Sequence, residues 1–195
     1  LGNPRIDVVI VSTDDDEIYH HACTKDTLDI GMRPPELCTD IASKWSVWQH
    51  SLAATEAKLG LVSVFLDLDC TSPLRWDSDV DEALDQFETE RPDMLMSCCA
   101  ARKNPYFNLV EPDEAGALRV SKPLANHVVA RQQAPVVYEH AASTYVLNPA
   151  YLKSATSLFE GRVLPFLMPS ERCMDIDSEL DFKIVEFLMK EQNCD

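Results

Sequence analysis

The feature that most constrains the fold of this chain is an alternation of short apolar runs, rich in β-branched residues, with longer amphipathic stretches. Short apolar runs bounded by turn residues are typical of buried strands, and apolar residues spaced three and four apart are typical of helices with one buried face. We expect strands at 6–11, 61–68, 94–100, 143–147 and 163–168, and helices at 15–24, 43–59, 78–91, 150–159 and 178–191. This alternation predicts an α/β fold with helices on the faces of a sheet.

A segment at 103–137 interrupts this alternation. Turn-forming pairs such as Asn104-Pro105 and Pro112-Asp113 divide it into short extended pieces, and such residues mark loops and turns. We therefore expect a hairpin-rich excursion here in place of another strand–helix–strand unit. The length of 195 residues favours one domain, 1–195, that contains this excursion.

The net charge of the chain limits the classes of partner that it can bind. Its 17 basic and 33 acidic residues give a formal net charge of −16, with no visible basic stripe, whereas nucleic-acid-binding proteins usually carry one. No apolar run approaches the roughly 18 residues of a membrane-spanning helix, and no signal peptide opens the chain. We therefore expect no nucleic-acid partner and no membrane.

The cysteines indicate a reducing compartment. There are seven of them, an odd number that cannot pair completely, and no C-x-x-C spacing occurs. A chain of this length does not need disulfides to stabilise its core. We expect reduced thiols, mostly buried as small apolar side chains, in a cytoplasmic protein.

The strongest candidate for chemistry is the acidic run that begins at Asp175. Side chains two apart in an extended segment point to the same side, so Asp175 and Asp177 are expected to face together, with Ile176 turned into the core. Two convergent carboxylates form a hard oxygen site suited to Mg²⁺, and such an ion can clamp a triphosphate during phosphoryl transfer. The alternative is that Asp177 or Ser178 caps the last helix.

Three further segments carry residues that could meet an anion. The run 71–75 (T-S-P-L-R) follows a strand-like run, and ligands of open α/β sheets bind outside the carboxyl ends of the strands. Arg33 and Arg131 lie in loop-like segments, and an arginine can clasp a carboxylate with two parallel hydrogen bonds. Taken singly, each of these segments is more typical of a solvated turn or loop than of an anion site.

Taken together, these segments resemble one family. The matching motifs, in chain order, are V-V-I-V-S-T-D-D at 8–15, R-P-P-E-L at 33–37, T-S-P-L-R at 71–75, R-Q-Q-A-P at 131–135 and D-I-D-S-E-L-D at 175–181. Over nearly its whole length the chain resembles the CMP-sialic acid synthetases, or N-acylneuraminate cytidylyltransferases. The resemblance implies a Rossmann-like, three-layer α/β/α nucleotidyltransferase fold and a homodimer, in which 103–137 is a small dimerisation insertion.

The resemblance also implies a reaction and a set of site residues. In this family CTP is joined to a nine-carbon 2-keto sugar acid: the anomeric hydroxyl attacks the α-phosphorus, and pyrophosphate leaves. The matched positions make Asp175 and Asp177 the catalytic pair that holds Mg²⁺. The residues implied at the nucleotide are Arg33, Ala42, Ser43 and Thr71, and those implied at the sugar acid are Asp69, Arg131, Gln133 and Tyr145. A looser match places Phe159 at a site across the dimer.

Two departures from the family pattern bear on function. The family opens with a strand, a phosphate-binding loop and a helix ahead of the segment that matches Val8, so the resemblance is to an N-terminally incomplete domain. Asp69-Cys70 stands where many relatives carry Gln-Pro or Gln-Ala, so a legionaminic- or pseudaminic-type acid is as compatible as a sialic acid. The alternatives are a non-catalytic dimeric remnant of the family and a cytidylyltransferase for an eight-carbon keto sugar acid.

Overall fold

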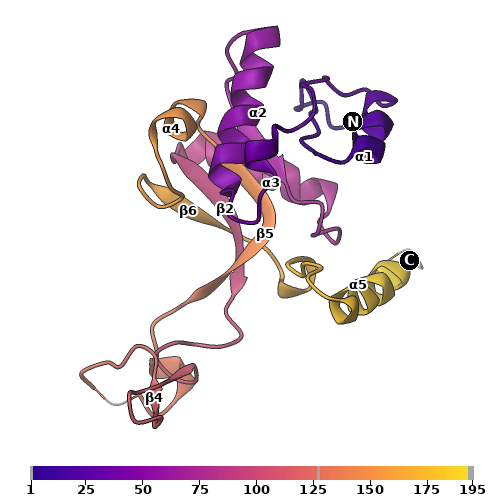
Figure 1. Ribbon diagram of the computed structural model, residues 1–195. Coiled ribbons are helices and arrows are strands. Elements are labelled where there is room, and N and C mark those ends of the chain that lie inside the picture. The colour runs from indigo at the N-terminus through magenta and orange to yellow at the C-terminus, as the bar shows by residue number, and fades with distance from the viewer. Residues whose placement is uncertain (1, 127, 193–195) are drawn as a thin grey trace. The chain divides into compact units, whose positions relative to one another are not determined.

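The computed structural model describes residues 2–126 and 128–192 and contains both helices and strands (Figure 1). The helices are α1 (Asp16–Cys23), α2 (Lys44–Leu59), α3 (Asp77–Glu90), α4 (Pro149–Ser154) and α5 (Glu179–Gln192). The strands are β1 (Phe65–Leu68), β2 (Met94–Ala100), β3 (Val110–Pro112), β4 (Leu118–Val120), β5 (Tyr138–Leu147) and β6 (Val163–Leu167). Short 3₁₀ helices lie at η1 (Pro35–Leu37), η2 (Arg131–Gln133) and η3 (Ser170–Arg172).

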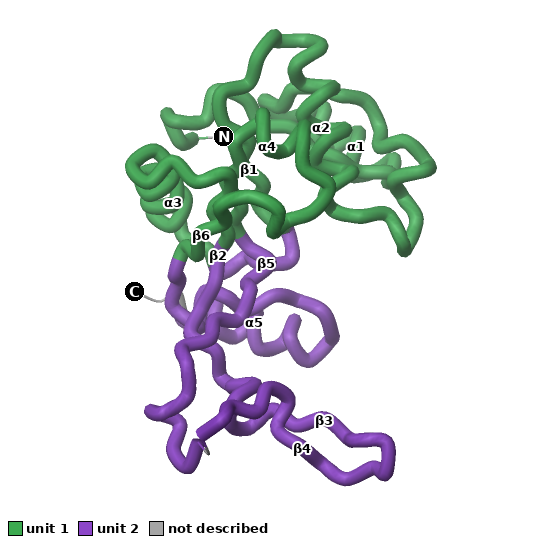
Figure 2. The backbone as a smooth tube through the Cα atoms, turned by 90° about the vertical axis from the view of Figure 1, so that its left-hand side faces the viewer, with its two compact units in different colours: residues 1–69, 75–96, 144–166 green, residues 70–74, 97–143, 167–195 purple. Residues whose placement is uncertain are grey.

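The chain forms two compact units, which Figure 2 distinguishes by colour. Unit 1 consists of residues 1–69, 75–96 and 144–166, and unit 2 consists of residues 70–74, 97–143 and 167–195. Strands β2, β5 and β6 each contribute residues to both units. The site residues are therefore described unit by unit.

A four-stranded sheet with the strand order β1-β5-β2-β6 confirms the predicted α/β fold. Strand β1 runs antiparallel to β5, in a register that places Phe65 opposite Leu147 and Asp67 opposite Tyr145. All of β2 except its last residue is buried, as expected of a strand that is covered on both faces. This burial explains why the apolar run at 94–100 predicted β2 at its observed bounds.

In unit 1, helix α2 contributes a buried aromatic face. Trp45, Trp48 and Leu52 are buried on this helix. The Trp45 ring meets the Tyr151 ring of α4 edge-on, with 5.5 Å between centroids, and its Nε1 donates a hydrogen bond to the Ala155 carbonyl oxygen at 2.8 Å. The indole nitrogen is thereby satisfied inside the core, which allows so large a ring to be buried there.

The length and the apolar character of the helices decide whether any of them could cross a membrane. No helix in the part of the chain that the structure describes combines the length and the apolar character that a membrane crossing requires.

The prediction of a strand at 6–11 is wrong. The structure leaves this segment irregular, and the Leu28 N–H, from another irregular segment, donates to the Val9 carbonyl oxygen at 2.8 Å. A β-branched run becomes a strand only where a neighbouring strand supplies a ladder of such bonds. The apolar run thus identified an extended, partly buried segment but not its partner.

Two elements are shorter than their predicted ranges, 61–68 and 150–159. Strand β1 lacks the first part of its range, and Leu61 is 91% exposed. Helix α4 stops early because a local turn follows it, in which the Glu160 carboxylate accepts the N–H and hydroxyl groups of Thr156. Side-chain bonds of this kind offer the backbone an alternative to the helix.

The segment 103–137 contains the predicted hairpin, formed by β3 and β4. At its turn Gly116 has φ of +82°, a left-handed conformation that suits glycine, and the Asp113 carboxylate accepts two N–H groups of the turn. At the base of the excursion, Asn104 Nδ2 donates to the Pro135 carbonyl oxygen at 2.9 Å. Its role as a dimerisation insertion stays a prediction.

Gly161 offers a direct test of the packing in unit 1. A Cβ added there would lie 2.6 Å from Tyr151 Cε2 and 2.7 Å from Asp93 Oδ2, and that carboxylate oxygen already accepts the Arg162 N–H at 2.7 Å. Because overpacking of this kind forces a rearrangement, Gly161→Ala should lower the free energy of unfolding by about 1–3 kcal/mol. Urea-induced unfolding measures the change.

Gly2→Ala is the matched control, because an added Cβ at Gly2 meets no atom of the described residues within 4 Å, its two chain neighbours apart. Its unfolding free energy should stay within about 0.5 kcal/mol of the parent chain. Equal stability of the two variants would contradict the packing described around Gly161.

Candidate functional site

A group of charged side chains lies at the end of β1 in unit 1. Asp67 belongs to β1 and Asp69 follows it, so that the two lie at alternate positions of an extended segment and share a face. Lys44, the first residue of α2, places its Nζ 3.1 Å from Asp67 Oδ2 and also forms an ion pair with Asp69. We call Lys44, Asp67 and Asp69 the β1-end triad.

Two aromatic rings lie next to the ammonium of the triad. Lys44 Nζ is 4.4 Å from the centre of the Tyr145 ring and 5.3 Å from that of Trp48, and the two rings meet edge-on with 4.9 Å between centroids. Each aromatic residue is only 2% exposed. Cations at such distances from a ring centre are attracted by its quadrupole, so the rings hold the ammonium in place.

Lys44 and Tyr145 both have pKa values above their usual ones. Burial lowers the pKa of the Lys44 ammonium, but the charges of Asp67 and Asp69 and the hydrogen bond to Asp69 outweigh it, so this pKa lies above its usual value. Burial raises the pKa of Tyr145 to about 12, against an opposing effect of Lys44. At neutral pH the triad therefore presents an ammonium above an uncharged phenol.

Three of the residues predicted at the nucleotide lie in unit 1 and make local contacts. Arg33 donates from Nε to Ser12 Oγ at 3.1 Å and from Nη2 to the Ser12 carbonyl oxygen at 2.6 Å. The Ala42 N–H donates within its loop. Ser43 Oγ accepts the Ser46 N–H at 3.1 Å, which makes Ser43 the N-cap of α2.

The fourth nucleotide residue, Thr71, lies in unit 2 next to the predicted metal-binding segment. The Ile176 N–H donates to the Thr71 carbonyl oxygen at 2.9 Å. Ile176 is half-buried and lines an apolar cavity of about 450 Å³ against α5. Asp175 is half-buried and Asp177 is exposed.

The structure also decides how α5 begins. Ser178 Oγ accepts the Asp181 N–H at 3.3 Å, which is the bond that an N-cap side chain makes, and its hydroxyl donates to the Asp181 carboxylate at 2.6 Å. Ser178 is thus the cap, and the Asp177 carboxylate is not used for it. Among residues 2–126 and 128–192 no group of three or more Asp, Glu, His and Cys side chains gathers around a possible metal position.

Two of the residues predicted at the sugar acid lie in η2 of unit 2. Arg131 donates from Nη2 to the carbonyl oxygens of Ala101, at 3.2 Å, and Arg102. Gln133 Oε1 accepts the Val129 N–H at 3.1 Å. Both side chains belong to exposed residues, and the backbone contacts hold the Arg131 guanidinium in a fixed position.

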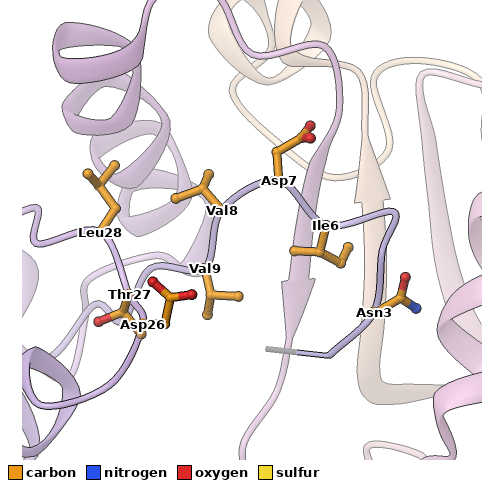
Figure 3. Close-up of a pocket in the computed structure, with 8 residues that line it drawn as sticks. All are labelled: Asn3, Ile6, Asp7, Val8, Val9, Asp26, Thr27 and Leu28. Atoms are coloured by element: carbon orange, nitrogen blue, oxygen red, sulfur yellow. The ribbon is translucent and has the colours of Figure 1, made fainter.

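Figure 3 shows a second cavity, of about 320 Å³, in unit 1. The residues that line it are Asn3, Ile6, Asp7, Val8, Val9, Asp26, Thr27 and Leu28. Its two carboxylates, from Asp7 and Asp26, make it unsuitable for a triphosphate. None of the predicted site residues lines it.

Lys44 is the residue of this site that sequence reasoning missed. The structure connects Asp69 and Tyr145, both predicted at the sugar acid, through its ammonium. The available signal was the spacing of Lys44 and Trp48, since side chains four apart on a helix lie on the same face. That spacing places a cation beside a buried aromatic residue.

Comparisons with known proteins agree with the family resemblance that the motifs indicate. No protein-family model matches the chain. The chain is 34% identical to post-translational flagellin modification protein B of Campylobacter coli. It is 35% identical to the CMP-N,N′-diacetyllegionaminic acid synthase of Campylobacter jejuni. Each match spans 186 residues, which are 95% of this chain and 78% of the relative.

Among solved structures, that of a CMP:2-keto-3-deoxy-manno-octonic acid synthetase complexed with CTP has the same fold. The TM-score is 0.62 at 14% identity, and the match covers 98% of this chain and 84% of that one. The fold and the relatives together define a chain of the nucleotidyltransferase class. Within that class it belongs to the CMP-sugar acid cytidylyltransferase family, which confirms the resemblance seen in the motifs.

The buried phenol next to the triad predicts a late alkaline titration. Because burial favours the neutral form, Tyr145 should ionise with a midpoint at about pH 12. The stability that it contributes is fully present below pH 10.0, its usual pKa, and is lost as the pH rises toward 12. Ultraviolet absorbance of the phenolate and pH-dependent unfolding measure the two effects.

Tyr19 provides the control, because its hydrogen bond to the Asp29 carboxylate also raises its pKa to about 12. Tyr145→Phe and Tyr19→Phe should each remove part of the late-titrating absorbance, and the double variant should remove both parts. A late component of undiminished size in Tyr145→Phe would show that the Tyr145 phenol is not shielded.

Proposed function

We propose that this protein is a CTP-dependent cytidylyltransferase that activates a nine-carbon 2-keto sugar acid of the sialic, legionaminic or pseudaminic type. The observation that carries the proposal is the 35% identity, over 95% of the chain, to a relative named as a CMP-N,N′-diacetyllegionaminic acid synthase. In the reaction the anomeric hydroxyl of the sugar acid forms a bond to the α-phosphorus of CTP. The bond to the β-phosphate breaks, pyrophosphate leaves with its electron pair, and the hydroxyl proton is released.

Mg²⁺ is the cofactor that the residues of unit 2 fit. This ion is usually bound through one or two carboxylates, with substrate phosphates and water completing its octahedral shell. Asp175 and Asp177 offer that number of carboxylates, and the Ser178 cap leaves the Asp177 carboxylate available. When bound, the ion would neutralise negative charge on the phosphates.

Arg131 is the proposed partner of the sugar-acid carboxylate. A protein with a net charge of −16 repels anionic substrates over long distances, so local cations have to supply the attraction. The guanidinium of Arg131 is exposed and is oriented by two backbone carbonyl groups. Gln133, in the same short helix, would contact the polar part of the sugar.

A homodimer is part of the proposal. The hairpin of the 103–137 segment exposes apolar side chains that a partner subunit would cover, namely Leu109, Val110 and Leu118. Phe159, in unit 1, is 71% exposed, which supports its proposed contact with the site of a second subunit. Sedimentation of the full-length gene product determines whether the dimer forms.

The test of the function is pyrophosphate release from CTP and Mg²⁺ with a panel of sugar acids. It is run on this chain and on the full-length gene product, each shown to be folded. Release with a nine-carbon 2-keto acid is the expected result. Release with the eight-carbon acid alone would favour the alternative substrate class, and no release from either folded protein would favour a non-catalytic dimeric relative.

Asp177→Ala tests the proposed metal site. Loss of a metal ligand removes several kcal/mol of transition-state stabilisation, so turnover in the full-length gene product should fall by about 100-fold or more. The melting temperature should change by only a few degrees, because Ser178 caps α5.

Glu179→Ala, in the exposed first turn of the same helix, is the control and should retain most of the activity. A large loss of stability in Asp177→Ala, with activity per folded molecule retained, would make Asp177 a structural residue.

A further inference from the structure

The β1-end triad presents polar atoms to solvent above rings that solvent cannot reach. The Lys44 side chain is 39% exposed even though two carboxylates and two rings surround its ammonium. Tyr145 and Trp48 are only 2% exposed. A ligand at this place therefore meets the ammonium and the carboxylates but no aromatic face, which rules out a base stacked on either ring.

The charges of the triad also act against the binding of an anion at this place. One ammonium and two carboxylates leave the triad with one more negative than positive charge. A carboxylate or phosphate that approached Lys44 would also approach Asp67 and Asp69, whose two negative charges oppose the attraction of the ammonium.

A group that both donates and accepts hydrogen bonds suits the triad. A sugar hydroxyl or an acylamino group can accept from the ammonium and donate to a carboxylate oxygen. Hydrogen bonds to charged partners are about twice as strong as those between neutral groups. The partners are also held in place before the ligand arrives, because Asp67 and Asp69 pair with the ammonium and two buried rings lie next to it.

We propose that Lys44 is a specificity-determining residue for the sugar acid. With Asp67 and Asp69 it forms a subsite that binds an uncharged hydroxyl or acylamino group of the sugar, and neither its carboxylate nor the phosphates of CTP. The inference rests on the proposed function, because it takes the sugar acid as the second substrate. It also assigns Tyr145 a positioning role, since the ring lies beneath the ammonium.

The experiment compares two dissociation constants by titration calorimetry on the full-length gene product. One is the Kd of CTP with Mg²⁺. The other is the Kd of N-acetylneuraminic or N,N′-diacetyllegionaminic acid in the presence of CMP, which cannot react with it. Lys44→Met should weaken sugar-acid binding by about tenfold or more, and its effect on CTP should stay below about twofold.

Lys58→Met is the matched control. Lys58 lies on the exposed last turn of the same helix, α2, so the variant makes the same change in net charge away from the triad. It should leave both dissociation constants unchanged. If Lys44→Met fails to fold because it leaves two carboxylates without their counter-ion, Asp69→Asn gives the same test and should also weaken the sugar acid selectively.

A methyl ester of each sugar acid separates the two possible contacts of Lys44. If the ammonium binds a hydroxyl or acylamino group, Lys44→Met weakens the acid and its ester by the same factor. If the effect disappears with the ester, Lys44 binds the carboxylate and the proposal is overturned. A loss of CTP affinity as large as that of the sugar acid would also overturn it, as would an unmodified protein that binds no sugar acid.

Failure of the proposed function has a different signature. A protein that binds the sugar acid through Lys44 but neither binds CTP nor releases pyrophosphate would refute the cytidylyltransferase and uphold the subsite. A protein that releases pyrophosphate with a sugar acid, but is indifferent to Lys44→Met, would uphold the enzyme and refute the subsite.

Discussion

The antiparallel pairing of β1 with β5 is the constraint on which the candidate site of unit 1 depends. It sets Asp67 opposite Tyr145, two residues far apart in the sequence, and thereby brings a carboxylate and a buried ring to one place. Helix α2 then adds Lys44 from its first turn, because Ser43 caps the helix just before it. A shift of one residue in this register would turn each side chain to the opposite face of the sheet and would separate the side chains of the triad.

The sequence predicted best those elements whose buried residues form a clear pattern, either a continuous run or one face of a helix. The apolar run at 94–100 fixed β2 because that strand is covered on both faces, and the aromatic stripe of α2 fixed that helix. The run at 6–11 looked the same in composition and is not a strand. Periodicity reports burial, whereas a strand also needs a neighbour for its hydrogen bonds, and no local pattern contains that information.

The candidate site was predictable to a similar extent. Family motifs pointed to Asp69 and Tyr145, and the structure joins them through an ion pair and a cation–π contact. Lys44 was missed because a lysine at the start of a helix is unremarkable until the residues that face it are known. The competing predictions at Asp177 and Ser178 could be separated only by hydrogen-bond geometry, which assigns the cap to Ser178.

The 103–137 excursion is closed at its own base. The Ala101 N–H donates to the Val137 carbonyl oxygen at 3.1 Å, and Asn104 reaches across to Pro135. Because its two ends are bonded to each other, the segment departs from the rest of the fold and returns to it at nearly one point. The entropy cost of closing such a loop rises only slowly with the length of the loop. A longer or differently shaped segment can therefore start and end at the same two points with little change in closure entropy, so the size of this excursion is only weakly constrained by the sheet that carries it.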